Sequence, residues 1–328
     1  MRAQSERIDS MLNRAPSSAG GHSRVKWYRR LAKDVRTNGA LYVYLLPAVL
    51  IVFLFHYLPM YGVQIAFRDF RPAKGITGSA WVGFKHFQRF FSSYQFGALI
   101  RNTLGLSMLS LVLAFPFPII MALMFTQLRN KRLQRVAQSI TYIPHFISTV
   151  VMASIIIIFL SPNNGLYGHI VRLFGGTPEN PLANAAAFRP IYVLTDIWQH
   201  SGWDSIIYIS ALSSIDPQLY DAAMVDGANR WQRILHVDIP GIVPTIVILL
   251  ILRAGSLMSV GFEKVFLLQN SLNITTSEVI STYVYKIGLE KAQYSYSAAI
   301  DVFNIAVNFV MLLFVNTVAK RISDTSLW

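Results

Sequence analysis

Apolar residues gather in long blocks along this chain, separated by shorter polar stretches. Six predominantly apolar segments lie at about 41–67, 102–126, 139–160, 190–212, 241–268 and 298–319. A helix needs roughly 20 mostly apolar residues to cross the hydrocarbon core of a bilayer. The pattern therefore predicts an all-α polytopic membrane protein with six transmembrane helices. Proline and polar residues interrupt several segments, which favours helices that pack in a bundle over helices that stand alone in lipid.

The N-terminal residues differ from this pattern. Residues 1–24 lack apolar periodicity and are predicted to be a disordered tail. Residues 25–36 place apolar side chains at helical spacing among basic ones, which is typical of a helix on anionic headgroups. A solvated basic tail explains the same residues equally well. Residues 1–36 are thus separated from a membrane domain predicted over 37–328.

Composition and charge indicate a membrane environment and predict the orientation of the chain in the membrane. The chain is 53% hydrophobic and only 14% charged, with 29 Lys and Arg against 16 Asp and Glu. Cytoplasmic loops accumulate basic residues, so the surplus is assigned to topology and no nucleic-acid partner is expected. With both termini in the cytoplasm, 17 Lys and Arg lie inside and 11 outside. The outer loop 68–101 is unusually basic and aromatic, and we expect it to fold as a cap at the outer surface.

One loop between the fourth and fifth apolar segments, over about 215–240, has the signals of a short capped helix. Asp216 can cap free backbone N–H groups, Pro217 suits the first helical position, and Gly227 suits the left-handed residue that ends a helix. The predicted helix has about ten residues and carries Ala222 and Ala223 side by side. Two adjacent alanines leave a low surface that a partner's groove can approach closely.

The same loop carries a resemblance. The run DAAMVDGA, followed after a spacer by Ile239-Pro240, resembles the EAA loop of ABC-importer permeases, with Asp221 where that family usually has Glu. In that family the short helix is the coupling helix, which docks into a cleft of the ATP-hydrolysing subunit. The resemblance implies that the contact and turn positions are Asp221, Ala222, Ala223, Asp226, Gly227 and Ala228.

The resemblance extends nearly from end to end of the chain. Segments such as WVGFKHFQRFF (81–91), TYIPHFIS (141–148) and EVISTYVYKIGL (278–289) are similar to permeases of the polysaccharide and lipo-oligosaccharide branch of the carbohydrate-uptake family. It implies a type I importer in a bacterial inner membrane, with lipid around it. Its partners would be a second permease subunit, two ATP-binding subunits and a solute-binding protein that delivers an oligosaccharide. The sugar is open between an acidic one, such as alginate, and a neutral one.

Polar residues inside the apolar segments are candidates for the translocation path. Arg253 lies in the middle of the fifth segment, where a charge is costly unless it pairs or faces a wet cavity. It is interpreted either as the partner of Asp196, Asp204 or Asp301, or as a contact for substrate. The stretch that holds Trp198, His200, Trp203 and Asp204 either lines the path, since sugars bind aromatic faces and polar groups, or is a distorted helix with interfacial tryptophans. His56 and His145 are interpreted as interhelical hydrogen-bonding residues.

No chemistry of its own is expected from this chain. It has no cysteine, no recognisable metal-ligand spacing and no GxxxxGK[ST] phosphate loop. No catalytic residue and no cofactor are therefore predicted, and ATP and Mg²⁺ would bind to the partner ATPase subunits. The rival interpretations are a secondary transporter, which leaves the loop 215–240 unexplained, and a membrane sensor or scaffold, which usually carries a soluble domain.

Overall fold

The structure is a computed structural model that describes residues 37–322. The predicted tail and interfacial helix over 1–36 lie outside these residues. The chain divides into two compact units, one up to Tyr61 and one from Gly62 onward. The second unit contains the loop 215–240 and most of the apolar segments.

The first apolar segment is helical from end to end. Its elements are α3 (Gly39–Val52), a π-helical turn (Phe53–Tyr57), α4 (Leu58–Met60) and a 3₁₀ stretch (Tyr61–Phe67). Together they form a 29-residue span, Gly39–Phe67, close to the predicted 41–67. Pro47 lies inside α3, where it removes one backbone donor from the helical ladder.

The basic and aromatic loop that follows is folded, as predicted. It begins with an antiparallel hairpin of β1 (Arg68–Arg71) and β2 (Gly75–Trp81), in which Arg68 pairs with Trp81. Helix α5 (Lys85–Phe91) comes next. The rings of Trp81, Phe84 and Phe87 lie 5.3–5.6 Å from that of Phe67, so an aromatic cluster joins the hairpin to α5.

The second and third apolar segments form α6 (Phe96–Leu113) with α7 (Pro116–Thr126), and α8 (Lys131–Tyr142) with α9 (Thr149–Leu160). The segment 139–160 is one of those that proline interrupts, and it is not one straight helix. A 3₁₀ turn at Ile143–Phe146 separates α8 from α9, and the two helices meet at 101°. Pro144 disfavours continuation of the helix, and Ser148 caps the start of α9 through Val151 N–H, so the chain begins a new helix there.

The fourth segment is α11 (Ala185–Ser213), a 29-residue helix that begins at the Asn184 cap. It follows α10 (Leu166–Leu173), a short helix that the hydrophobic pattern did not indicate, and a 3₁₀ turn at Pro181–Ala183.

The remaining elements run from the loop to the C-terminal helix. They are α12 (Pro217–Val225), α13 (Arg230–Arg233), a π turn (Ile234–Asp238), α14 (Ile239–Ala254), α15 (Phe262–Leu268), α16 (Ile274–Ser277), α17 (Ile280–Tyr285), a π turn (Lys286–Glu290) and α18 (Tyr294–Ile322). The fifth predicted segment, 241–268, is not one helix. Helix α14 ends at Ala254, and α15 starts separately after Gly261. A side chain at Gly255 would overlap Leu312 of α18, so glycine allows the close approach there.

The predicted count of six crossings stays a prediction. Within residues 37–322, four helices are long and apolar enough to span a membrane, and five if α8 and α9 form one bent span. Helix α11 is not among them, because Asp196, Gln199, His200 and Asp204 lower the hydropathy of its middle.

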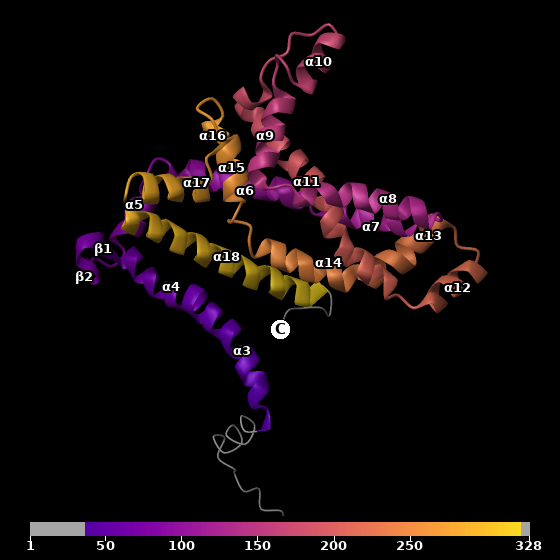
Figure 1. The fold of residues 1–328 in the computed structure, drawn as a ribbon, viewed down its shortest axis with the longest axis horizontal. Coiled ribbons are helices and arrows are strands. Elements are labelled where there is room, and N and C mark those ends of the chain that lie inside the picture. The colour runs from indigo at the N-terminus through magenta and orange to yellow at the C-terminus, as the bar shows by residue number, and fades with distance from the viewer. Residues whose placement is uncertain (1–36, 323–328) are drawn as a thin grey trace, which may run out of the picture. The chain divides into compact units, whose positions relative to one another are not determined.

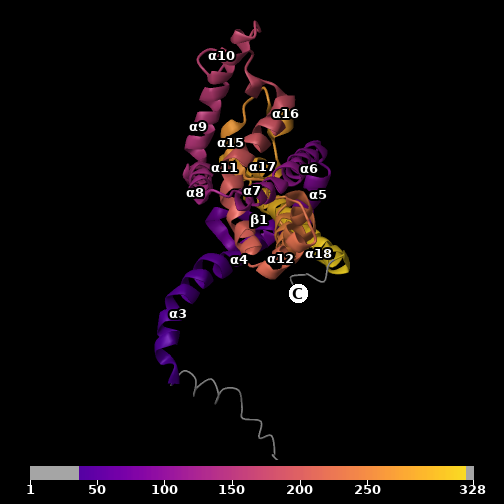
Figure 2. The ribbon, with the colours of Figure 1, turned by 90° about the vertical axis from the view of Figure 1, so that its right-hand side faces the viewer.

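Helix α11 is central to the second unit. It packs against α7, α8, α14 and α16, and buried side chains of α11 and α9 meet Val265 and Leu268 of α15 in one core cluster. Figure 2 shows α9 and α10 toward the top of this unit and α12 near its bottom, and Figure 1 shows α12 at the right-hand edge. The polar middle of α11 therefore lies between two ends that are built from different short helices.

Candidate functional site

The loop 215–240 forms the predicted helix. Asp216 Oδ1 accepts a hydrogen bond of 2.9 Å from Gln218 N–H, Pro217 occupies the first turn, and α12 runs for nine residues. Gly227 has a φ of +74°, in the left-handed region. Both ends of the helix are thus fixed by the residues that the sequence singled out.

The outer surface of α12 is largely open. Asp221, Ala222, Asp226 and Gly227 are exposed, whereas Ala223 and Ala228 are half-buried. Three apolar side chains are exposed beside them, with Val225 at 88% and Leu219 and Met224 at slightly more than half. The helix thus exposes small and apolar side chains together, and its predicted docking to a partner stays a prediction.

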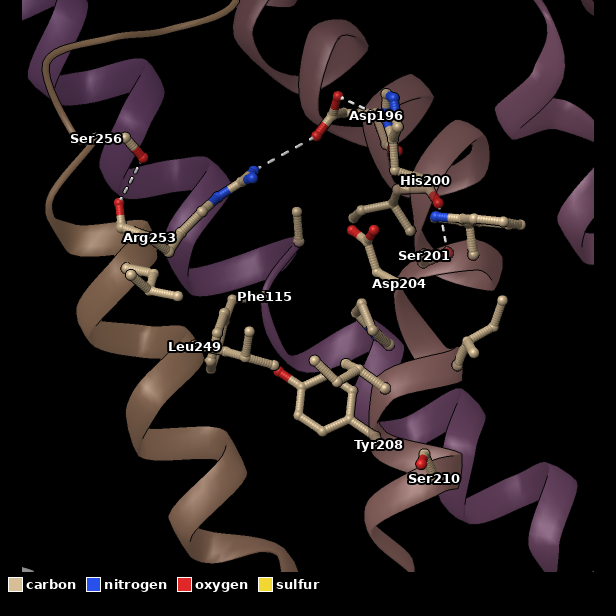
Figure 3. Close-up of a pocket in the computed structure, with 17 residues that line it drawn as sticks. Phe115, Asp196, His200, Ser201, Asp204, Tyr208, Ser210, Leu249, Arg253 and Ser256 are labelled. Carbon is tan, nitrogen blue, oxygen red and sulfur yellow. Dashed lines mark hydrogen bonds and ion pairs between the residues drawn. The ribbon is translucent and has the colours of Figure 1, made fainter. Parts of the chain in front are cut away.

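A cavity of about 800 Å³ lies between α7, α11 and α14. Figure 3 shows the side chains of α11 facing Arg253 and Leu249 of α14 across it. Asp196, His200 and Asp204 are spaced four residues apart on α11, so they share one helix face. That face turns toward the cavity and brings the polar middle of α11 together with Arg253.

Three nitrogen-bearing side chains approach the carboxylate of Asp196. His200 Nδ1 lies 3.2 Å from it, Lys264 Nζ 3.7 Å and Arg253 Nη2 3.9 Å. Lys264 and Arg253 differ in access, because the Lys264 side chain is 5% exposed and that of Arg253 is 50% exposed. Arg253 thus keeps part of its guanidinium free to face a ligand in the cavity.

A second, polar cavity of about 370 Å³ shares the same cluster. Asp196, His200, Asp204, Arg253 and Ser256 line both cavities. The second one continues toward Ser107 and Ser110 of α6 and the chain after α14. The charged cluster therefore lies where two cavities meet, as a constriction in a pathway would.

The predicted pathway residues are only partly brought together. His200, Trp203, Asp204 and Arg253 line the large cavity, whereas Trp198 is exposed and lines neither cavity. Trp203 stacks on the ring of His145, with centroids 4.7 Å apart and planes 7° from parallel. Within the described residues His145 Nδ1 has no hydrogen-bond partner. The His145 ring therefore contributes a stacking contact instead of the interhelical hydrogen bond that was predicted at this nitrogen.

Sequence reasoning missed Lys264 and Tyr192. Lys264 was counted with the outer loops, but its side chain is buried against Asp196, and its ammonium lies 5.1 Å from the Tyr192 ring centre. A lysine inside the apolar run 241–268 was the available signal. Spacing could not show the contact, since α15 and α11 meet only in the folded chain. Among residues 37–322 there is also no group of three or more His, Asp or Glu that could hold a metal ion.

Comparison with known proteins agrees with this geometry. Residues 114–324 match the family described as binding-protein-dependent transport system inner membrane component. The chain belongs to this family and is an inner-membrane, multi-pass permease subunit of an ABC importer. The rival interpretations, a secondary transporter and a scaffold, are not favoured.

Relatives cover nearly the whole chain. It is 42% identical over 300 residues to the polygalacturonan/rhamnogalacturonan transport system permease protein YteP of Bacillus subtilis, covering 92% of this chain and 94% of the relative. It is 38% identical to protein LplB of the same organism, over 93% of this chain and 94% of that one.

Solved structures give the same result. A bacterial ABC transporter involved in the import of the acidic polysaccharide alginate contains a chain with a TM-score of 0.83 and 42% identity, which covers 90% of this chain and 99% of that chain. A bacterial alginate ABC transporter in complex with an alginate pentasaccharide-bound periplasmic protein gives 0.84 and 42%, over 91% and 100%. The expected all-α permease fold is confirmed.

Proposed function

We propose that this permease carries an acidic oligosaccharide through the cavity between α11 and α14, driven by ATP hydrolysis in two partner subunits. A solute-binding protein delivers the sugar, and a second permease subunit completes the pathway. ATP and Mg²⁺ bind to the partner subunits, and this chain supplies the passage and the coupling surface.

One observation carries the proposal: the coupling loop directly joins the two helices that line the cavity. Helix α11 ends at Ser213, α12 and α13 follow, and α14 begins at Ile239. The loop thus places α12 next in the chain to two of the cavity's wall helices, α11 and α14. If α12 docks into an ATP-hydrolysing subunit through its exposed small and apolar side chains, closure of that subunit moves the walls of the cavity.

The proposal of an acidic substrate is based on Arg253. Its guanidinium lies 3.9 Å from Asp196, longer than a direct hydrogen bond, and half of its side chain is exposed. A uronate carboxylate can accept two parallel N–H bonds from such a group. The names of two relatives agree, since polygalacturonan and alginate are both polyuronates. Trp203 lines the same cavity and adds an aromatic face for the sugar ring.

The proposed orientation assigns the two ends of the second unit to the two faces of the membrane. We place α12 at the cytoplasmic face, where the ATP-binding subunits are, and α10 at the outer face, where the binding protein docks. Figure 2 shows α10 toward the top of this unit and α12 near its bottom. Both termini then lie in the cytoplasm, as the Lys and Arg distribution favours.

The test is reconstitution of the complete transporter in proteoliposomes with its cognate binding protein. Uronate oligomers and neutral glycans of equal length are compared for uptake and for stimulation of ATP hydrolysis. We expect only the uronates to stimulate both. Stimulation by neutral glycans alone would reject the acidic substrate and leave the permease assignment in place.

A further inference from the structure

A buried carboxylate lies at the junction between the coupling loop and the cavity helices. Asp238 is the last residue of the π turn before α14 and is 2% exposed. Burial of a carboxylate is costly unless hydrogen-bond donors face its oxygens. The donors that Asp238 uses therefore define what this position holds together.

The two oxygens of Asp238 accept from two different elements. Tyr220, on α12, donates its phenolic O–H to Oδ1. Gln127, the residue after α7, donates from Nε2 to Oδ2 over 3.1 Å. These partners are 18 and 111 residues away in the sequence. One side chain thus joins the coupling helix, the end of α7 and the start of α14.

The donor on α12, the phenol of Tyr220, stays protonated. Burial, and after it the hydrogen bond to Asp238, raise the pKa of the Tyr220 phenol well above its usual value of 10.0. Tyr220 therefore keeps its proton at any physiological pH and remains a donor. The three side chains also line one polar cavity of about 460 Å³, with Lys131 and Arg233 on its wall.

We propose that Asp238 is a positioning residue that transmits displacement of the coupling helix α12 to α7 and α14. This inference rests on the proposed function of α12 and deepens it. The loop between α12 and α14 contains Gly227 and a π turn, so the covalent connection alone is compliant. The Tyr220–Asp238–Gln127 bonds bypass that connection and make α12 follow the membrane helices as one body.

Variants that keep the size of each side chain test the two hydrogen bonds of Asp238. Tyr220→Phe removes one donor. Asp238→Asn leaves a single acceptor oxygen where two were used. The exchange variant Gln127→Glu with Asp238→Asn reverses donor and acceptor in one bond and keeps the net charge. The amide introduced at position 238 can donate to the new carboxylate at position 127, and its oxygen can still accept from Tyr220.

The assembled transporter in proteoliposomes, with alginate oligosaccharide on its binding protein, is measured for uptake per ATP hydrolysed. The chain has no cysteine, so spin labels at Gln218→Cys on α12 and Arg129→Cys after α7 report the distance between these elements without background from this chain. Co-purification of the ATP-binding subunits is recorded for every variant.

We expect Tyr220→Phe and Asp238→Asn to lower uptake per ATP by about tenfold or more, the effect of one lost bond to a charged group, and to broaden the label distance. The exchange variant should recover wild-type coupling to within about twofold. If Asp238→Asn fails to assemble and the exchange variant assembles normally, the same conclusion is supported.

Wild-type coupling and an unchanged label distance in Asp238→Asn, or an exchange variant that couples no better than Asp238→Asn, would overturn the inference. A bulky change on the outer surface of α12, Ala222→Trp, tests the proposed function separately. If Ala222→Trp leaves assembly and coupling intact, the docking role of α12 fails, whatever the Asp238 variants do.

Discussion

Among single residues, Arg253 has the most accessible side chain of the three that approach Asp196. Lys264 is packed against Tyr192 and Asp196, and His200 is bound to Asp196 on its own helix. Arg253 reaches across the cavity from a different helix, as Figure 3 shows, and its bond to Asp196 is the longest of the three. Of the three side chains, Arg253 therefore loses the weakest interaction when a ligand carboxylate takes the place of Asp196.

We predict that Arg253→Gln lowers uptake of uronate oligomers at least about tenfold, because a lost charged hydrogen bond costs about 1.5–3 kcal/mol. Uptake of any neutral glycan that enters should change much less. Lys320→Gln removes one positive charge at the far end of α18 and serves as the matched control. Equal losses for Arg253→Gln and Lys320→Gln, or no loss for either, would show that the charge of Arg253 does not select the substrate.

A second residue-scale prediction concerns the contact between α8 and α11. A side chain at Gly202 would overlap the carbonyl oxygen of Thr141, so only glycine lets the two backbones approach this closely. Gly202→Ala should cost about 1–3 kcal/mol and lower the thermal unfolding midpoint in detergent. Gly97→Ala, where a new methyl group meets no atom within 4 Å, is the control and should not lower it. Equal midpoints for both variants would contradict the packing of α8 on α11.

At the scale of elements, the exit of α12 depends on one backbone conformation. Gly227 has a φ of +74°, and a methyl group there would meet nothing within 4 Å, so any effect of substitution comes from backbone strain alone. We predict that Gly227→Val, at a cost of roughly 1–2 kcal/mol, uncouples ATP hydrolysis from uptake or prevents assembly.

Gly227→Asn is the matched variant, since asparagine tolerates the left-handed region better than a β-branched residue does. It should couple clearly better than Gly227→Val when assembly, ATP hydrolysis and uptake are measured together. Wild-type transport by Gly227→Val with a normally coupled ATPase would show that the conformation of this loop exit is unimportant for function.

The elements show which parts of the fold local sequence can predict. The start and end of α12 were predictable because Asp216, Pro217 and Gly227 act on their own backbone. The break at 143–148 was predictable, because Pro144 disturbs its own helix. The break at 255–261 was missed because the hydrophobic run continues across it, and the close approach of Gly255 to Leu312 exists only in the folded chain. Lys264 and Asp238 were missed for the same reason, since their partners are distant in sequence.

For the whole molecule, the predicted six crossings and cytoplasmic termini can be tested with single cysteines in a chain that has none. Four exposed positions lie in different segments between the predicted crossings, namely Ala80, Glu179, Gln218 and Leu272. Ile280 is fully buried, so a cysteine there could not be labelled from solution. In spheroplasts, an impermeant maleimide should label positions 80, 179 and 272 at once, and position 218 only after the membrane is opened. Immediate labelling at 218 would reverse the orientation.

The central claim is that α12 couples this permease to an ATP-hydrolysing subunit, and the most direct measurement is a cross-link in native membranes. A photo-reactive amino acid replaces the exposed Met224 of α12 and, separately, the exposed Leu173 of α10 at the opposite end of the second unit. The account predicts that position 224 forms an adduct with the ATP-binding subunit, identified by mass spectrometry, and that position 173 does not. An adduct with that subunit from position 173, and none from position 224, would contradict it.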